Sequence, residues 1–511
     1  MLRMSCDYQR HPRPTRLRYA RRGRHGRRDL QGGGIMKIES VELLVVGAGP
    51  AGLGAAIAAA ERGVETVVVD GFSQPGGQYF MQLPAAFSSA KGADMEEKGK
   101  LWLDKLGKLP VRVISKTLVW GIFEEEGRDT WLAALYGSDS PRYFRAAKII
   151  LAGGAYDSPV PFPGWTLPGV MTCGAALILL KTYRVAPGTK ALVTGAGPLL
   201  LSVAAHLIEA GVRVEAVCES NRPFPRGLVH LPAILENFSR VREGARYAGK
   251  LMSAATPYKA GWSVLSTSGR ERVERAVIAK LDKAGRPIPG KTQTFDVDLV
   301  VAGYNLTPNT GLARMVGCEL NYQPQKGGWI PLRDENMRAS KPGVYVVGDG
   351  AGIGGADNAL LEGQIAGVHA AQETGHLSPA SADEILRGIR AKRRSQVRFG
   401  KMYGDLFTPQ HGLIALAQDD TVLCRCEDVT LGEVKKAIQM GAATLREVKM
   451  ATRCGMGNCQ GRVCERSVSA VLVEAMSGEL EAYKSAGYYS IRPPLHPIPV
   501  QFLAESQLED L

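Results

Sequence analysis

The sequence predicts an α/β protein that contains two nucleotide-binding strand–helix–strand units and a small, mostly helical, cysteine-rich domain. Two observations support this prediction. A glycine-rich turn occurs twice, each time between an apolar strand and a helix rich in alanine or leucine, and five of the nine cysteines stand between Cys424 and Cys464. The length of 511 residues fits about three domains.

The first unit has every part of a dinucleotide-binding fingerprint. In chain order these are a strand at 43–46, the turn glycines Gly47, Gly49 and Gly52, a helix at 53–62, a strand at 66–69 and Asp70. Gly47 permits the tight turn, Gly49 lets the backbone approach a pyrophosphate, and Gly52 lets the helix pack on the strand. Asp70 is placed to accept hydrogen bonds from a ribose. This Rossmann-like pattern predicts a bound FAD or NAD.

The second unit departs from the fingerprint at one position. Its parts are a strand at 190–194, the glycines Gly195 and Gly197, a helix, a strand at 212–217 and Glu219. Leu200 stands where a third glycine is expected, which pushes the helix away from the strand. Glu219 favours a ribose hydroxyl over a 2′-phosphate. Three interpretations stay open: an NAD site, a site for another adenine nucleotide, and a purely structural unit.

The cysteine spacing indicates a metal centre. Cys424 and Cys426 form a Cys-x-Cys pair, and Cys454, Cys459 and Cys464 follow at intervals of five residues. A cysteine cluster in a chain without a secretion signal favours metal binding over structural disulfides. An iron–sulfur cluster, a zinc site and redox disulfides are all considered, and the Cys-x-Cys spacing fits zinc poorly. Neighbouring arginines and glycines suit a negatively charged [2Fe–2S] centre.

Two segments after the second unit favour FAD in the first. The strand that ends in Gly348-Asp349-Gly350 resembles the second flavin motif of the two-dinucleotide-domain flavoproteins, the glutathione/thioredoxin reductase superfamily. The resemblance implies that Asp349 holds the ribityl chain and that the second unit is inserted in the first. It assigns further flavin contacts to Gly348, to Gly77 and Gln78 in a loop over the ring, and to Gln364 in a helix.

The cysteine-rich segment closely resembles the bacterioferritin-associated-ferredoxin-like (BFD-like) [2Fe–2S] domain. The resemblance implies four cluster ligands, Cys424, Cys426, Cys459 and Cys464. Cys454 is then the spare thiol and the competing ligand, because it has the same spacing to Cys459 as Cys459 has to Cys464.

These patterns predict the domain organisation. The expected parts are a basic arm at 1–35, a discontinuous FAD domain at 38–155 and 295–375, an inserted nucleotide domain at 156–294, a linker with a helix at 376–420, the [2Fe–2S] domain at 421–476 and a tail at 477–511. The arm holds ten arginines and two aspartates and supplies +8 of the net charge of +13. It is interpreted as a mis-assigned start before Met36, a transit peptide, or a nucleic-acid- or membrane-binding arm.

The whole order of parts, over about residues 38 to 500, is similar to the α (or A/B) subunits of dye-linked amino-acid dehydrogenases. The resemblance implies an electron-transfer subunit that receives electrons from an amine-oxidase-like flavoprotein β subunit, with a small ferredoxin-like subunit as a further partner. The alternatives are a stand-alone NADH-dependent flavin–ferredoxin reductase and a non-catalytic redox scaffold or sensor. No catalytic residue can be named. No paired cysteines precede Cys424, which argues against disulfide reduction.

The expected location is the cytoplasm, with peripheral contact at the inner face of a membrane as an option. No run of about 18 apolar residues predicts a membrane span. Outside the arm, nothing indicates nucleic-acid binding.

Overall fold

The structure is a computed structural model that describes residues 38–82, 94–137, 142–224, 226–476 and 478–504. These described residues form one unit by their contacts. The predicted arm lies outside the described residues. Within the described ranges, no helix has the length and apolar composition needed to cross a bilayer.

The first sheet gathers strands from both parts of the discontinuous domain. Its order is β3 (Val111–Ile114), β2 (Thr66–Val69), β1 (Ile38–Val46), β6 (Tyr143–Leu151), β5 (Trp131–Tyr136) and β4 (Leu118–Glu124), and β19 (Val344–Val346) also pairs with β6. Helices α1 (Pro50–Ala60) and α8 (Ala356–Glu373) cross closely, because Gly54, Gly363 and Gly367 leave no side chain between their backbones. This crossing brings the first glycine turn next to the later Gly-Asp-Gly segment.

The second sheet has the order β11 (Tyr258–Ala260), β10 (Arg213–Glu219), β9 (Lys190–Ala196), β15 (Leu299–Tyr304) and β8 (Val170–Thr172). Helices α3 (Cys173–Lys181), α4 (Leu199–Glu209) and α6 (Phe238–Ser253) share one core with it. An antiparallel sheet of β12 (Trp262–Ser268), β13 (Arg275–Leu281) and β14 (Pro287–Asp296) packs into a second core with strands of this sheet. Because β15 pairs with β9, this sheet extends to Tyr304, and the expected boundary at 295 stays a prediction.

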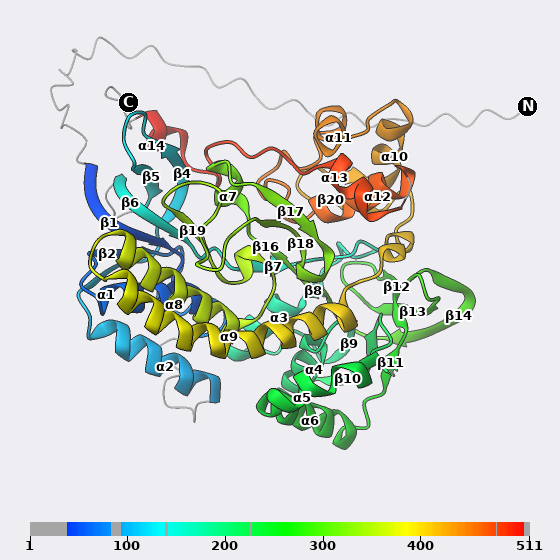
Figure 1. Cartoon of the computed structure of the whole chain (residues 1–511). Coiled ribbons are helices and arrows are strands. Elements are labelled where there is room, and N and C mark those ends of the chain that lie inside the picture. The colour runs from blue at the N-terminus through cyan, green and yellow to red at the C-terminus, as the bar shows by residue number, and fades with distance from the viewer. Residues whose placement is uncertain (1–37, 83–93, 138–141, 225, 477, 505–511) are drawn as a thin grey trace, which may run out of the picture. The chain divides into compact units, whose positions relative to one another are not determined.

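Two small sheets accompany the main ones. They are β7 (Ala155–Asp157) paired with β16 (Leu306–Pro308) and β17 (Leu320–Gln323) paired with β18 (Gly328–Pro331). Helix α2 (Asp94–Gly107) packs on the core of the first sheet, and α5 (Leu231–Glu236) and α7 (Gly311–Met315) are short helices. Figure 1 shows β7, β16, β17 and β18 between the first sheet and the cysteine-rich domain.

The cysteine-rich domain is mostly helical, as predicted. It contains β20 (Val422–Cys424), β21 (Val429–Thr430), α10 (Leu431–Gln439), α11 (Leu445–Thr452), α12 (Glu465–Met476) and α13 (Leu480–Ala486), and the tail ends with α14 (Val500–Ala504). Thr430 and Glu433 form a capping box at the start of α10. Three buried cysteines lie in the core of this domain.

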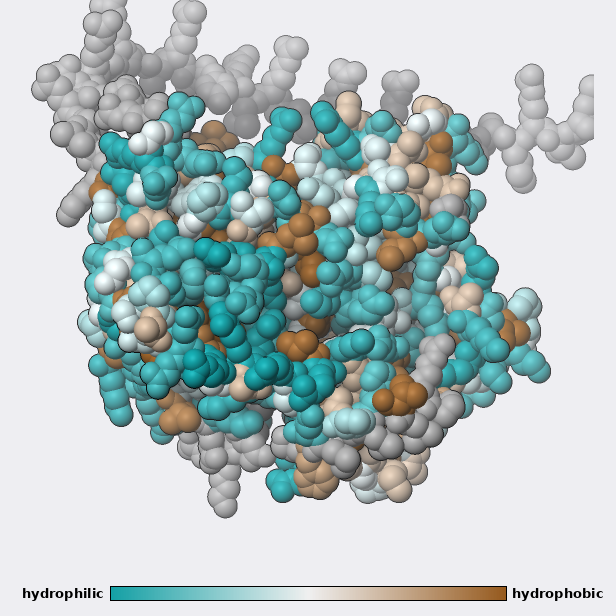
Figure 2. Space-filling view, viewed as in Figure 1, coloured by the Kyte–Doolittle hydropathy of each residue, from teal (hydrophilic) through white to brown (hydrophobic). Residues whose placement is uncertain are grey.

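A 29-residue helix, α9 (Pro379–Phe407), occupies much of the predicted linker. Its first half packs beside α8 through Ala382 and Leu386 (Figure 1), and its last turns pack against Ala233 through Met402 and Leu406. The side of α9 that faces the viewer is largely hydrophilic (Figure 2). The helix therefore spans both nucleotide-binding units.

Candidate functional site

The first glycine turn borders a cavity of about 120 Å³. Gly47 has a φ of +104°, which only glycine adopts without strain, and it lines this cavity. Three other glycines that line it are Gly71, Gly153 and Gly350. Because glycine has no side chain, a phosphate group could come close to the backbone at these positions.

The predicted flavin loop lies beside this turn. A Cβ added at Gly77 would stand 2.7 Å from the Cα of Gly49, so only glycine fits there. Gly52 packs directly on the Gly47 carbonyl. Gln78 is exposed in the same loop, and Gln364 is half-buried on α8.

Asp70 is buried at the end of β2, and its carboxylate binds its own turn. It accepts hydrogen bonds from the backbone N–H of Ala48 and, at 2.7 Å, from that of Phe72. Burial raises the pKa of Asp70 despite these two donors. The contact to Ala48 fixes the glycine turn, and the predicted ribose contact stays a prediction.

Asp349 organises the start of α8. One of its carboxylate oxygens accepts hydrogen bonds from the backbone N–H of Gly354 at 2.9 Å and of Gly355 at 3.0 Å. Burial raises the pKa of Asp349. Asp349 therefore stands between Gly350, which lines the first cavity, and the positive end of α8, which is a suitable place for a phosphate or a reduced flavin.

Glu362 on α8 supports this segment and was not predicted as a site residue. It accepts the backbone N–H of Gly348 at 3.0 Å and both guanidinium nitrogens of Arg333 at 2.6 and 2.7 Å. Arg393 of α9 donates to it at 2.7 Å. Burial alone would raise the pKa of Glu362, but the two guanidinium groups lower it to about 2. The signal in the sequence was an acid in the middle of a helix that is rich in alanine, leucine and glycine.

The second glycine turn is closed by the chain itself. Glu219 is 1% exposed and accepts the Gly197 N–H at 2.7 Å and the Asn221 N–H at 2.8 Å. Burial raises the pKa of Glu219 to about 7. The Tyr403 hydroxyl, near the end of α9, would lie 2.7 Å from a Cβ added at Gly197. Gly195 packs on the Gly303 carbonyl of β15.

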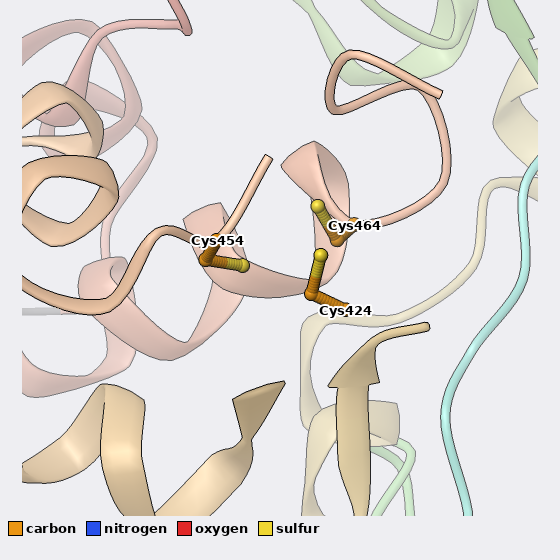
Figure 3. A group of neighbouring side chains, drawn as sticks. All are labelled: Cys424, Cys454 and Cys464. Atoms are coloured by element: carbon orange, nitrogen blue, oxygen red, sulfur yellow. The ribbon is translucent and has the colours of Figure 1, made fainter. Parts of the chain in front are cut away.

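Three cysteine sulfurs converge in the third domain (Figure 3). The Sγ atoms of Cys424, Cys454 and Cys464 are buried and lie within 4.8 Å of one another. Cys424 ends β20, Cys464 directly precedes α12, and Cys454 follows α11. The neighbouring thiols of Cys454 and Cys464 lower the pKa of Cys424 to about 2. The structure thus places Cys454, the predicted spare thiol, beside two predicted ligands.

The remaining two cysteines form a neighbouring pair. The Cys426 and Cys459 side chains are close enough to affect each other's charge, and burial together with the neighbouring thiols raises the pKa of Cys426. Cys426 is exposed and Cys459 is partly exposed. All five thiols are free, and a [2Fe–2S] centre needs four of them; the three whose sulfurs group within 4.8 Å are Cys424, Cys454 and Cys464. The buried group and its donors fit such a centre.

Donors around the cysteines suit a negatively charged cluster. The backbone N–H of Gly455 lies 3.5 Å from the Cys424 Sγ. Arg462 donates to the Cys459 carbonyl at 3.2 Å, and Arg453 pairs with Glu427 at 2.9 Å. Positive charge and N–H donors stabilise the reduced form of an iron–sulfur centre.

The cysteine-rich domain contacts both nucleotide units. Arg314 of α7 makes a two-pronged ion pair with Glu465 of α12, with both N···O distances at 2.8 Å. The Trp165 indole, in the core of the second unit, donates to the Val422 carbonyl at 2.7 Å. The Tyr322 and Tyr483 rings stack with centroids 4.3 Å apart. These contacts hold the cysteines in a fixed place relative to the glycine turns.

The tail also contributes residues that the sequence did not reveal. Leu495 and His496 line the cavity at the first glycine turn. Arg462 donates to the Leu495 carbonyl at 3.3 Å and contacts the His496 ring at 3.4 Å. One arginine therefore joins the cysteine loop to the wall of the first nucleotide site.

Comparison with known proteins identifies both parts of this arrangement. Residues 41–375 match the pyridine nucleotide-disulphide oxidoreductase family, and residues 422–474 match the BFD-like [2Fe-2S] binding domain.

Similar proteins extend the comparison to nearly the whole chain. An opine oxidase subunit of Agrobacterium tumefaciens (strain Ach5) is 31% identical over 91% of each protein. The hydrogen cyanide synthase subunit HcnB of Pseudomonas protegens is 30% identical over 92% of this chain and 99% of that protein. The crystal structure of L-proline dehydrogenase from P. horikoshii has the same fold, with a TM-score of 0.65 and 22% identity over 91% of this chain and 80% of that one.

Proposed function

Because the chain belongs to the pyridine nucleotide-disulphide oxidoreductase family and carries a BFD-like [2Fe-2S] domain, it is an FAD-dependent oxidoreductase with an iron–sulfur centre, and we propose that it is the electron-transfer subunit of an amino-acid or amine dehydrogenase. The observation that carries this proposal is the fixed docking of the cysteine group on both nucleotide units. A bound flavin accepts an electron pair, and a [2Fe–2S] centre passes electrons singly.

Specific residues are assigned to the two cofactors. We assign the first glycine turn, Asp70, Gly77, Gln78, the Gly348–Asp349 pair and Gln364 to FAD. In this proposal, Asp349 and the backbone N–H groups around it orient the flavin. Glu362 holds the Gly348 backbone in place by accepting its N–H. The proposed cluster ligands are Cys424, Cys426, Cys459 and Cys464, with Cys454 as the competing ligand.

The second glycine turn supports this function over a stand-alone NADH-dependent reductase. A pyrophosphate bound at Gly197 would need the space beside the turn, where the Tyr403 hydroxyl lies. Glu219 is also fully engaged with backbone donors of its own turn. We therefore propose that the second unit is structural and that reducing electrons come from a partner protein.

The partner and the substrate follow from the relatives. The opine oxidase and hydrogen cyanide synthase relatives are both named as subunits, so we propose an amine-oxidase-like flavoprotein as the partner, with a small ferredoxin-like chain as a further component. The proposed substrates are opines, proline, D-hydroxyproline and glycine. We propose that their oxidation takes place on the partner, from which this chain receives the electrons.

A stopped-flow experiment tests the proposal. The purified chain, with flavin and cluster bound, is mixed with NADH, and the flavin absorbance should stay unchanged. The same chain with its flavoprotein partner is then mixed with each candidate substrate, and one of them should reduce both the flavin and the cluster. Rapid flavin bleaching by NADH alone would support the reductase instead. If the partner oxidises the substrate and the cluster of this chain stays oxidised, the result would support the alternative that this chain is a non-catalytic scaffold.

A further inference from the structure

Tyr489 of the C-terminal tail lies in the middle of the cysteine group. It is 1% exposed and belongs to the same core as Cys424, Cys454 and Cys464. The matched [2Fe-2S] domain ends at residue 474, so this side chain comes from outside it. The predicted tail is therefore part of the cysteine site.

Two glycines of the cysteine loop lie in close contact with the Tyr489 ring. A Cβ added at Gly455 would lie 2.7 Å from the ring, and one added at Gly461 would lie 2.5 Å from it. Both glycines also have positive φ values, at +84° and +83°. The loop that carries Cys454, Cys459 and Cys464 is thus shaped around one aromatic ring.

The ring is held at both ends of its segment. The backbone N–H of Tyr489 donates to Glu465 at 3.2 Å, and Glu465 is itself fixed by Arg314. Six residues later, the backbone N–H of Leu495 donates to the Trp120 carbonyl at 2.8 Å. The Lys449 ammonium stands 5.5 Å from the ring centroid. Tyr489 is therefore positioned as firmly as a residue of the domain itself.

Its hydroxyl has no partner that explains its position. Among the described residues, the Tyr489 oxygen is buried without a hydrogen-bond partner, and the ring that carries it packs on Gly455, the residue after Cys454. A buried hydroxyl that makes no hydrogen bond destabilises the folded protein, so a partner is expected when the site is complete. The backbone N–H of Gly455 already donates to the Cys424 sulfur in this site. A sulfur atom is therefore the acceptor that is available to the Tyr489 hydroxyl.

We propose that Tyr489 is a positioning residue of the iron–sulfur site and that its hydroxyl donates a hydrogen bond to a cysteine or cluster sulfur. This inference rests on the proposed function, since it requires the cluster to be bound. A donor to sulfur stabilises the added negative charge of the reduced centre and raises its reduction potential. The tail thereby sets the driving force for electron transfer to the cluster.

The test compares Tyr489→Phe with Tyr488→Phe in the full chain carrying both cofactors. Phenylalanine keeps the ring between the two glycines and removes only the hydroxyl. The cluster potential, followed by the electron paramagnetic resonance signal during a redox titration, should become more negative in Tyr489→Phe, while the flavin potential stays unchanged. Tyr488 is the control because its ring packs on Trp329 and is 37% exposed. Tyr488→Phe should move neither potential.

A second variant separates hydrogen bonding from packing. Fluorotyrosine at position 489 has a more acidic hydroxyl and should move the cluster potential upward, opposite to phenylalanine. Equal potentials in the unaltered chain and Tyr489→Phe, or a shift in the same direction for both substitutions, would overturn the inference alone. A cluster that never assembles in the unaltered chain would overturn the proposed function as well, so the two failures are distinguishable.

Discussion

At the scale of single residues, the cysteine group raises a choice between two ligands. Cys454 is buried beside Cys424 and Cys464, whereas Cys459 pairs with Cys426 nearer the surface. A [2Fe–2S] centre needs two thiolates on each iron. Cys424 with Cys464 and Cys426 with Cys459 provide two such pairs, which is the proposed set. Cys454 then remains as a thiol next to the cluster.

Serine substitutions test this choice. Cys459→Ser should remove the paramagnetic signal of the reduced cluster and leave the flavin absorbance intact, because serine replaces a thiolate with a poor iron ligand. Cys454→Ser is the matched control and should retain the signal. Iron and sulfide content, measured in parallel, reports assembly directly. The reverse pattern, with loss in Cys454→Ser only, would transfer the ligand role to Cys454.

The sequence allowed the prediction that the cysteines form a metal site. It did not allow a prediction of which sulfurs lie together in space. The equal spacing of Cys454, Cys459 and Cys464 gives no local reason to separate them. The grouping depends on the path of the loop, in which Arg453 adopts a left-handed conformation, and on Tyr489, which arrives from 25 residues after Cys464. Contacts of this kind leave no periodic pattern in a sequence.

At the scale of elements, α8 depends on one buried carboxylate. Glu362 is 1% exposed and binds Arg333 from the first domain, Arg393 from α9 and the backbone of Gly348. It therefore ties two helices to the flavin segment. The sequence predicted a helix in the 376–420 region, yet its partner could not be predicted, because Arg393 and Glu362 are 31 residues apart.

Replacing this carboxylate should be costly. Glu362→Gln keeps the shape of the side chain but leaves two guanidinium groups without their counter-charge. The free energy of unfolding in urea should fall by about 3–5 kcal/mol. FAD retention on gel filtration should also fall, because Gly348 loses a charged acceptor. The exposed Asp419–Lys435 pair is the control, and Asp419→Asn should cost less than about 1 kcal/mol. An equal effect of both substitutions would contradict the role of Glu362.

The same residue predicts acid sensitivity. The pKa of Glu362 is lowered from 4.5 to about 2 in the folded protein. A lowered folded pKa means that its stabilising contribution is complete above pH 4.5 and is lost as the pH falls toward 2. The contribution amounts to about 3 kcal/mol for this shift. Urea unfolding of the unaltered chain and of Glu362→Gln, measured between about pH 5 and the most acidic condition that both tolerate, should converge in stability. A constant difference would contradict the assignment.

At the scale of the whole molecule, the three functional segments are joined by few but buried contacts. Trp165 links the second unit to β20, Arg314 links α7 to α12, and Arg462 links the cysteine loop to the tail. The units themselves could be predicted from glycine turns and cysteine spacing, since these are local patterns. Their docking could not, because each contact joins residues that are distant in the chain and ordinary in type.

The Arg314–Glu465 pair offers the sharpest test of this docking. Its side chains are 9% and 20% exposed, so Arg314→Met leaves a largely buried carboxylate unpaired, which should lower the free energy of unfolding by about 3 kcal/mol. Arg286–Glu474 also joins the second unit to α12, but its side chains are 55% and 41% exposed. Arg286→Met should therefore cost less than about 1 kcal/mol. After photoreduction of the flavin, electron arrival at the cluster should slow in Arg314→Met and stay unchanged in Arg286→Met, because the buried pair, unlike the exposed one, helps to hold the cysteine domain at a fixed distance. Identical transfer rates in both variants would mean that this pair does not set the distance between the two centres.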